Sequence, residues 1–387
     1  MPDRDLLIDV SRLVWRFWRG GLPTGIDRVC LAYVEHFRNR ALAVTQRRGR
    51  YHVLSARDSD RLFDLFSQTP ASFRRDFVRL AFRARVAARR HPHRKGLLYL
   101  NIGHTGLDEP TLPQWIARSG LRAVFLIHDL IPLTHAEYCR PCEHKKHRKR
   151  IDNVLASAHG IIGNSRATIE QLAAYAAIRN VELPPAVVAS IAGSPQPSNV
   201  APRTFARPHF IIVGTIEGRK NHRLLLHIWK RLVAKYGEGA PLLVVAGQRG
   251  WEANEAIAML DRAIDLEGHV LECEASGDEE LAGLIAGARA LLMPSFAEGF
   301  GLPVAEALQL GTPVIASDLR VFREFANSIP TYLDPLDGPA WEAAIVEFTG
   351  DSPERRRQMQ AIGHYQAPDW RAHFNVVEDW LRSLRVT

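Results

Sequence analysis

The sequence has few cysteines and no long apolar segment. Its four cysteines (Cys30, Cys139, Cys142 and Cys273) are too few and too scattered for a disulfide framework, which favours a reducing compartment. No apolar run approaches the roughly 18 residues that a membrane-spanning helix needs, and the charged N-terminus does not resemble a secretory signal. With 46% hydrophobic and 24% charged residues in 387 positions, disordered and collagen-like chains are excluded. We therefore expect a cytoplasmic protein of two domains.

Lysine is also scarce, and charge is distributed unevenly. Only seven of the 50 basic residues are lysine. Residues 1–200 hold 31 basic and 17 acidic residues, a net charge of +14, so the remainder of this +8 chain has a net charge of −6. This asymmetry predicts that the first half faces an anionic partner, which could be anionic lipid, nucleic acid or a phosphorylated substrate.

Short apolar runs alternate with helix-like stretches along the whole chain. Continuous apolar character is typical of parallel strands covered on both faces. The expected strands are 6–10, 97–100, 123–127, 160–163, 210–214, 242–247, 290–293 and 313–316. Six prolines between Pro184 and Pro208 predict an interdomain linker. The fold class is therefore α/β with two doubly wound domains, over residues 1–195 and 206–365, followed by an amphipathic helix in 366–387.

The loop after residues 210–214 contains Arg219 and Lys220, directly before a helix-like stretch. Free backbone N–H groups at a helix start and two cations suit a diphosphate. The alternative is an ordinary turn with solvated charges. The spacing is not that of a P-loop.

The loop after residues 290–293 contains two carboxylates, Glu298 and Glu306, on either side of a Gly-Phe-Gly turn. Such a pair can bracket a polyhydroxyl ligand, each carboxylate accepting hydrogen bonds from adjacent hydroxyls. We place Glu306 in the first turn of the helix that Pro303 begins. In the alternative interpretation Glu306 only supports that helix N-terminus.

This second loop, Pro-Ser-x-x-Glu-Gly-Phe-Gly-Leu-Pro-x-x-Glu-Ala from Pro294, resembles the Glu-x7-Glu motif of the retaining glycosyltransferases of family 4. The resemblance covers nearly the whole chain, and its further matches are Thr24–Arg28, His128-Asp129, Asn164-Ser165, Asp278–Leu281, Gly311–Asp318 and Glu324. It implies the GT-B fold, in which two Rossmann-like domains face a central cleft. Residues 1–195 would bind the acceptor, residues 206–365 the nucleotide sugar, and the 366–387 helix would cross back to the N-terminal domain.

The resemblance also implies roles for individual residues. The catalytic residues would be His128, Asp129 and Glu298; the donor-binding residues would be Gly25, Thr215, Arg219, Lys220, Glu298, Gly299, Phe300, Gly301, Leu302 and Glu306. Lys220 and Arg219 would clamp the diphosphate, Glu298 would hold the sugar, and Glu306 the ribose. Thr215 stands where many family members have arginine, so Arg219 would substitute for it.

The family resemblance implies retention of configuration and no metal or other cofactor. Two short motifs offer metal sites as alternatives. Asp58-Ser59-Asp60 has the Asp-x-Asp pattern of metal-dependent transferases of another fold, but we place it in a solvated polar loop. Cys139 and Cys142, with two histidines nearby, have partial zinc-site spacing but no second pair of ligands.

The stretch from Phe73 to Lys95 is strongly basic and amphipathic, with Phe73, Phe77, Leu80 and Ala84 on one face. It is either an element that binds the membrane surface or a packed helix with solvated arginines. The run Lys145–Arg150 is similarly ambiguous. Acceptors in the family are often lipid-linked glycans at the inner leaflet, so we expect peripheral association with the inner membrane.

The resemblance thus implies a hexosyltransferase of bacterial surface polysaccharide or lipopolysaccharide synthesis. The expected donor is a nucleoside-diphosphate sugar, GDP-mannose. A sugar-nucleotide epimerase or hydrolase on the same scaffold is one alternative. A nucleic-acid-binding protein is another, although the basic stretches lack an aromatic stacking platform, so we expect no nucleic-acid partner.

Overall fold

The computed structural model describes residues 4–21, 23–67, 70–86, 96–193, 200–273 and 277–386. The chain forms two compact units. The N-terminal unit consists of Met1–Leu130, His144–Ile191 and Trp370–Thr387, and the C-terminal unit of Ile131–Glu143 and Ala192–Asp369. No helix among the described residues is long and apolar enough to cross a bilayer.

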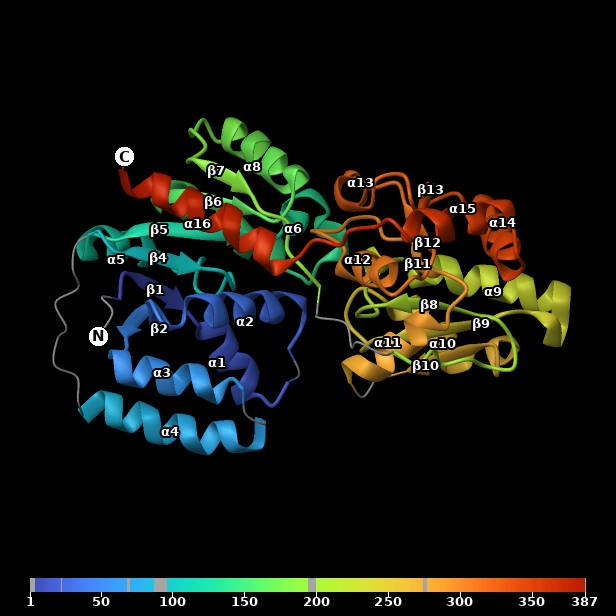
Figure 1. Ribbon diagram of the computed structural model, residues 1–387, viewed down its shortest axis with the longest axis horizontal. Coiled ribbons are helices and arrows are strands. Elements are labelled where there is room, and N and C mark those ends of the chain that lie inside the picture. The colour runs from blue at the N-terminus through green and yellow to red at the C-terminus, as the bar shows by residue number, and fades with distance from the viewer. Residues whose placement is uncertain are drawn as a thin grey trace. The chain divides into compact units, whose positions relative to one another are not determined.

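The sheet of the N-terminal unit has the strand order β3-β2-β1-β4-β5-β6-β7 (Figure 1). Its strands are β1 (Leu6–Asp9), β2 (Ala41–Arg47), β3 (Arg50–Val53), β4 (Leu98–Asn101), β5 (Arg122–Ile127), β6 (Ala158–Gly163) and β7 (Ala186–Val188). All neighbours are parallel except β2 and β3, which form an antiparallel hairpin at one edge. The strand order reverses between β1 and β4, as in doubly wound nucleotide-binding folds.

Helices connect these strands, and one of them lies in an outer layer. They are α1 (Ser11–Trp18), α2 (Gly25–Phe37), α3 (Ala56–Leu65), α4 (Pro70–Val86), α5 (Leu112–Ser119), α7 (Glu143–Ser157), α8 (Arg166–Ile178) and α16 (Trp370–Val386). Helix α4 lies outside α1 and α3, away from the sheet (Figure 1). Helix α16 packs on the sheet, because a Cβ at Gly160 would come within 2.5 Å of the Trp380 ring.

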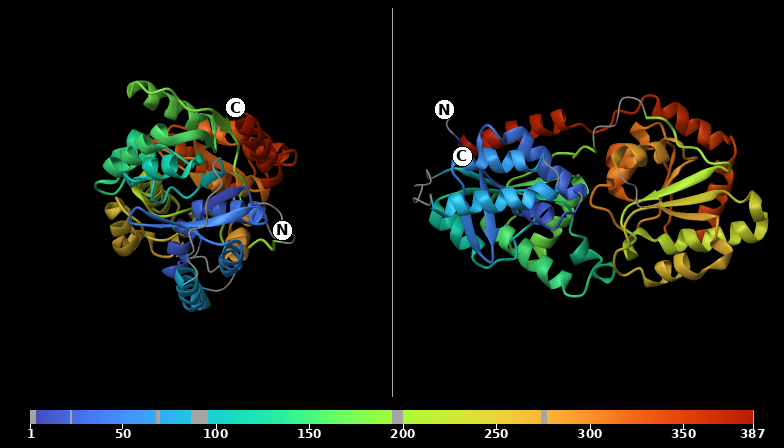
Figure 2. Two further views of the ribbon diagram at one scale, coloured as in Figure 1. Left: turned by 90° about the vertical axis from the view of Figure 1, so that its left-hand side faces the viewer. Right: turned by 90° about the horizontal axis from the view of Figure 1, so that it is seen from below.

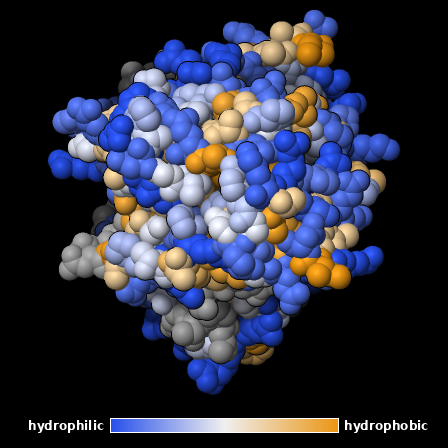
Figure 3. Space-filling view, turned by 90° about the vertical axis from the view of Figure 1, so that its right-hand side faces the viewer, coloured by the Kyte–Doolittle hydropathy of each residue, from blue (hydrophilic) through white to orange (hydrophobic). Residues whose placement is uncertain are grey.

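The sheet of the C-terminal unit has a similar strand order, β10-β9-β8-β11-β12-β13, and all neighbouring strands in it are parallel. Its strands are β8 (His209–Val213), β9 (Leu242–Ala246), β10 (Val270–Cys273), β11 (Leu291–Met293), β12 (Val314–Ser317) and β13 (Thr331–Leu333). Its helices include α6 (Ile131–Thr134), α9 (His222–Tyr236), α10 (Asn254–Arg262), α11 (Asp278–Ala286), α12 (Leu302–Gln309), α13 (Arg320–Ala326), α14 (Gly338–Thr349) and α15 (Pro353–Ile362). Helices cover both faces of this sheet (Figure 2), and the fully buried Trp229 and Trp341 belong to its core. The face in Figure 3 is largely hydrophilic, with small scattered apolar groups.

The eight predicted strands are confirmed as β1, β4, β5, β6, β8, β9, β11 and β12, with shifts of one or two residues at their ends. The fold class is therefore α/β with two doubly wound sheets. Strands β2, β3, β7, β10 and β13 were not predicted. Strand β2 begins with an apolar run, residues 41–44, that was overlooked. Strand β3 contains polar residues and has no buried position, and β7, β10 and β13 are only three or four residues long.

Three sequence-based expectations are corrected. The predicted linker 184–208 contains β7, which pairs with β6 and belongs to the N-terminal unit, so the part of the linker before Ile191 is sheet. Within the predicted N-terminal domain of residues 1–195, the segment Ile131–Glu143 groups instead with the C-terminal unit. The motif Asp58-Ser59-Asp60 lies in α3 and not in a loop, because the Ser55 hydroxyl accepts a hydrogen bond from Asp58 N and caps the helix.

Candidate active site

An ion cluster lies at the carboxyl ends of β8 and β11, the edge at which open parallel sheets bind ligands. Glu298 follows β11, and Arg219 and Lys220 lie in the 3-10 turn Gly218–Lys220 after β8. Lys220 Nζ lies 2.6 Å from Glu298 Oε1, and Arg219 Nη1 lies 2.8 Å from Glu298 Oε2. Arg219 and Lys220, which follow β8, thus pair with both oxygens of the Glu298 carboxylate, which follows β11.

Neighbouring groups fix the geometry of this ion cluster. Ser295 Oγ donates a hydrogen bond to Glu298 Oε1 at 2.8 Å, and Arg219 Nε lies 2.7 Å from Glu217 Oε1. The backbone of the two loops is joined as well, because Phe296 N donates to Arg219 O at 2.8 Å. Glu217 and Ser295 were not among the predicted site residues, because their contacts depend on the fold.

The ion cluster is buried, since the side chains of Glu298 and Lys220 are each 6% exposed. Its positive and negative charges balance. Burial opposes ionisation of Glu298, but Arg219 and Lys220 outweigh burial and lower its pKa to about 2. Burial lowers the pKa of Lys220, although Glu298 opposes this effect. Burial also raises the pKa of Glu217, against the influence of Arg219. An anionic ligand could therefore replace Glu298 as the partner of Arg219 and Lys220.

The turn that carries Lys220 depends on a glycine at the end of β8. Gly214 has φ +130°, and a Cβ there would lie 3.3 Å from Lys220 Cε, so glycine provides both the backbone conformation and the space. Thr215 follows directly, and its methyl group lies against Gly250, where a Cβ would come within 2.5 Å. The structure therefore places Thr215 beside the loop after β9.

The Gly-Phe-Gly turn positions the start of α12. Gly301 has φ +99° and precedes Leu302, the first helical residue; a Cβ at Gly301 would lie 2.3 Å from the Phe322 ring. The Phe300 ring is buried and stacks on Phe325 with 4.8 Å between ring centroids. The side chain of Phe300 is thus part of the core, and its backbone, with that of the half-buried Gly299, is what a ligand could contact.

Glu306 is buried at 7% exposure and is the fifth residue of α12, not a first-turn residue as expected, because the helix begins at Leu302. A Cβ at Gly193 would lie 2.9 Å from Glu306 Cγ. The close approach of Gly193 was missed, because this glycine looked like ordinary linker composition.

The segment Ile131–Glu143, here called the strap, covers the loops of the ion cluster. The Tyr138 ring stacks on Phe296 with 4.9 Å between centroids and 3° between planes. Its Cδ1 lies 3.4 Å from where a Cβ of Gly218 would be, and the Arg140 guanidinium lies 4.2 Å from the Trp251 ring centroid. These contacts explain why the strap belongs to the C-terminal unit.

In the N-terminal unit, His128 and Asp129 follow β5 directly. His128 is buried, and its Nε2 lies 2.8 Å from the Ile102 carbonyl oxygen. A carbonyl only accepts, so Nε2 carries the proton and Nδ1 is the acceptor. Burial lowers the pKa of His128 to about 4, so the ring is neutral at pH 7. Asn164, at the end of β6, donates to the His128 carbonyl oxygen at 2.8 Å, and Asp129 is half-buried.

Gly25 is the first residue of α2, and a buried carboxylate fixes the turn before it. Asp27 accepts hydrogen bonds from Thr24 N at 2.8 Å and Thr24 Oγ1 at 2.7 Å. Arg12 Nε and Arg16 Nε lie 2.6 and 2.8 Å from the two oxygens of Asp27. Burial opposes the charge on Asp27, but Arg12 and the Thr24 hydrogen bonds outweigh it and lower its pKa.

The structure thus brings Arg219, Lys220 and Glu298 into one cluster, with the Gly299–Leu302 turn and Glu306 in the same unit. Gly25, His128 and Asp129 lie in the other unit. No group of three or more potential metal-ligating side chains occurs among the described residues. Asp60 of the Asp-x-Asp pattern instead pairs with Arg4 at 2.6 Å.

The C-terminal unit matches a known sequence family. Residues 203–361 match the family described as "Glycosyl transferases group 1". The serotype-specific mannosyltransferase WbdA of Escherichia coli is 30% identical over 245 residues, which is 59% of this chain and 30% of that protein. The O-antigen chain mannosyltransferase B of Escherichia coli is 32% identical over 250 residues, covering 60% and 63%. The chain therefore spans about a third to just under two thirds of the length of these relatives.

Solved structures resemble the chain over a greater length. HepE of Anabaena, crystallised with UDP and glucose, has 15% sequence identity and a TM-score of 0.67, covering 98% of this chain and 99% of HepE. Sucrose-phosphate synthase from Thermosynechococcus elongatus has 18% identity and a TM-score of 0.55, covering 80% and 77%. The chain has the GT-B fold of these glycosyltransferases.

Proposed function

From the match of residues 203–361 to the family of glycosyl transferases group 1, we propose that this chain is a retaining, metal-independent hexosyltransferase. It would transfer a hexose from a nucleoside-diphosphate sugar to a bacterial surface glycan or lipid-linked oligosaccharide. The observation that carries the proposal is the buried ion cluster of Arg219, Lys220 and Glu298 at two adjacent strand ends. It supplies two cations for a diphosphate and one carboxylate for a sugar.

In the proposed reaction the donor diphosphate takes the place of Glu298 on Arg219 and Lys220. The bond between the anomeric carbon and the diphosphate oxygen breaks, and the two cations stabilise the charge that develops on the leaving group. The acceptor oxygen forms the new bond on the same face of the sugar. Its proton passes to the departing phosphate. Glu298, released from its cations, accepts hydrogen bonds from the sugar hydroxyls.

Further residues of the C-terminal unit would bind the rest of the donor. The backbone N–H groups of the Gly299–Leu302 turn would contact the phosphate and sugar, helped by the positive end of the α12 dipole. Glu306 would accept hydrogen bonds from the ribose hydroxyls. Thr215, beside the loop after β9, would contribute a neighbouring polar contact.

In the N-terminal unit, neutral His128 would accept a hydrogen bond from a sugar hydroxyl through Nδ1, and Asp129 would lie beside it. Gly25 would let the start of α2 approach the phosphates. We propose that this unit binds the acceptor and that α16 completes it.

Mannose is the proposed hexose because several relatives are named as mannosyltransferases, two of them of O-antigen chains. GDP-mannose is therefore the proposed donor, although the solved relative HepE was crystallised with UDP. We also propose that the protein works at the cytoplasmic face of the inner membrane, held there peripherally.

The test is a thermal-shift panel of GDP, UDP and their hexose conjugates on the wild type, Lys220→Ala and the control Lys230→Ala. Lys230 is a half-buried lysine of α9 paired with Asp265 at 3.2 Å. We expect one nucleotide class to raise the Tm of the wild type and the control, and to lose most of this effect in Lys220→Ala. Urea denaturation without nucleotide shows whether that variant is folded.

Absence of any nucleotide effect on the wild type would refute the assignment. Rapid turnover of the stabilising sugar nucleotide without an acceptor would favour a hydrolase or epimerase instead.

A further inference from the structure

The apolar face predicted for α4 is buried within its own unit. Phe73 and Leu80 are almost fully buried, and Phe77 packs edge-on against Trp18 with 6.1 Å between ring centroids. These side chains hold α4 on α1 and α3. The same residues cannot bind a membrane at the same time, and residues 87–95 of the predicted basic stretch lie outside the described part of the chain.

A different face of α4 is exposed to solvent and is both basic and apolar. Here the outer stripe denotes Arg75, Val78, Arg79 and Phe82, which follow one another at helical spacing. Val78 is 53% exposed and Phe82 is 70% exposed, and both arginine side chains are at least as exposed as Val78. Helix α4 is the outermost layer of its unit (Figures 1 and 2), so the outer stripe is accessible.

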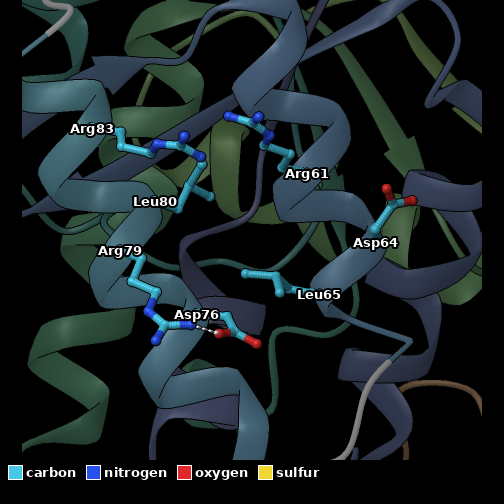
Figure 4. Close-up of a pocket in the computed structure, with 7 residues that line it drawn as sticks. All are labelled: Arg61, Asp64, Leu65, Asp76, Arg79, Leu80 and Arg83. Atoms are coloured by element: carbon cyan, nitrogen blue, oxygen red, sulfur yellow. Dashed lines mark hydrogen bonds and ion pairs between the residues drawn. The ribbon is translucent and has the colours of Figure 1, made fainter.

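A groove of about 330 Å³ runs between α3 and α4 beside the outer stripe. Its lining residues are Arg61, Asp64, Leu65, Asp76, Arg79, Leu80 and Arg83. In Figure 4, Arg61 and Arg83 point toward one another across the groove, and Leu65 and Leu80 lie beneath them. The groove therefore combines two guanidinium groups with an apolar floor.

The two acidic residues of the groove, Asp64 and Asp76, pair with arginines other than Arg61 and Arg83. Asp76 lies 3.2 Å from Arg75 and 3.3 Å from Arg79, and Asp64 pairs with Arg38 at 2.5 Å.

Asp64 and Asp76 therefore do not neutralise the charges of Arg61 and Arg83. Arg61 lies 3.6 Å from Asp58, and no acidic side chain of the described residues pairs with Arg83. The groove therefore has an excess of positive charge.

We propose that the α3–α4 groove and the outer stripe bind an anionic phospholipid in a bilayer surface. The phosphate lies between Arg61 and Arg83, whose planar guanidinium groups suit bidentate phosphate contacts. Val78 and Phe82 enter the boundary between headgroups and acyl chains, as the apolar residues of interfacial helices do. This site rests on the proposed function, since it would hold the transferase at the membrane that carries its acceptor.

The apolar residues favour a lipid over other anions. A free phosphate gains nothing from an exposed phenylalanine and valine next to its site. Single-stranded nucleic acid needs a series of aromatic platforms, and the outer stripe has one aromatic ring. A bilayer uses both the cations and the apolar side chains.

The experiment is co-sedimentation of the full chain with vesicles of phosphatidylcholine, alone or mixed with phosphatidylglycerol, in the absence of nucleotide. The variants are Arg61→Gln with Arg83→Gln, and separately Phe82→Ser. Arg118→Gln on α5 is the matched control, because Arg118 is exposed in the same unit. Each lost cation should weaken partitioning about fivefold, so the double variant should bind the mixed vesicles about thirtyfold less. Phe82→Ser should bind about fivefold less.

The thermal shift with the nucleotide should stay unchanged in all these variants, which separates this site from the donor site. Equal binding to both vesicle types, or mixed-vesicle binding that the double variant retains, would overturn the proposal. So would tighter binding to single-stranded DNA than to vesicles, or full competition by inorganic phosphate with no effect of Phe82→Ser.

Discussion

Replacing Glu298 by glutamine tests the electrostatics of the ion cluster directly. The side chain keeps its shape but loses the charge that Lys220 and Arg219 hold at 2.6 and 2.8 Å. The pKa of Glu298 falls from 4.5 to about 2 on folding. Because the folded pKa is lower, the ionised form stabilises the fold above the unfolded pKa, and this stabilisation is lost as the pH falls toward 2.

The shift corresponds to about 3 kcal/mol at pH 7 and to about 1 kcal/mol at pH 3. This agrees with the cost of about 3–5 kcal/mol for removing one partner of a buried ion pair. Glu298→Gln should therefore lower the free energy of unfolding by about 3 kcal/mol at pH 7, and the deficit should shrink to less than half of that at pH 3.

The assay is urea denaturation of the wild type and Glu298→Gln across this pH range. Glu347→Gln, at an exposed position of α14, is the control and should change little at any pH. A deficit below about 1 kcal/mol at pH 7, or one that is equally large at pH 3, would refute the reasoning. The same variant should bind the nucleoside diphosphate more tightly than the wild type while losing transfer activity, because Arg219 and Lys220 no longer have to be released.

Three further predictions concern the fold around the site. Burial raises the pKa of Asp9 to about 6, so the folded state loses stability as the pH rises through this value; Asp9→Asn should stabilise by up to about 3 kcal/mol at pH 8 and little at pH 4, by urea denaturation. Gly301→Ala should destabilise by about 2 kcal/mol or more, because φ is +99° and the new methyl group meets Phe322; a thermal scan that matches the wild type would contradict this. Asp27→Asn should cost about 3 kcal/mol at pH 7, because Arg12 loses a buried partner at 2.6 Å, and calorimetry at pH 7 checks it.

The sequence was sufficient for the central strands and for the residues that follow them. Continuous apolar runs are unambiguous in a parallel sheet, and the polar residues at their ends necessarily meet at one edge. Arg219, Lys220 and Glu298, up to 79 positions apart in the chain, each follow such a strand, and the family resemblance assigned them to one donor site before their contacts were known.

Other features depend on tertiary contacts that leave no local pattern. Edge strands such as β3 and β10 are half-exposed, so their composition resembles that of loops. The pairing of Glu217 with Arg219 and the approach of Gly193 to Glu306 follow from loop conformation. The outer stripe could not be predicted for a similar reason. Periodicity located the apolar face of α4, but only the structure showed that this face packs inside the unit and that the outer stripe is the exposed one.

The way the chain divides has a practical consequence for dissecting this protein. The backbone passes from one unit to the other four times, at 130/131, 143/144, 191/192 and 369/370. Cleaving it in the proline-rich segment would leave an N-terminal fragment whose Tyr138 has lost Phe296 and whose sheet lacks α16. The complementary fragment would expose the ring that Tyr138 covers and would carry α16 without its binding site. Neither piece contains a whole folding unit, so activities of the two halves must be separated by point substitution in the intact polypeptide.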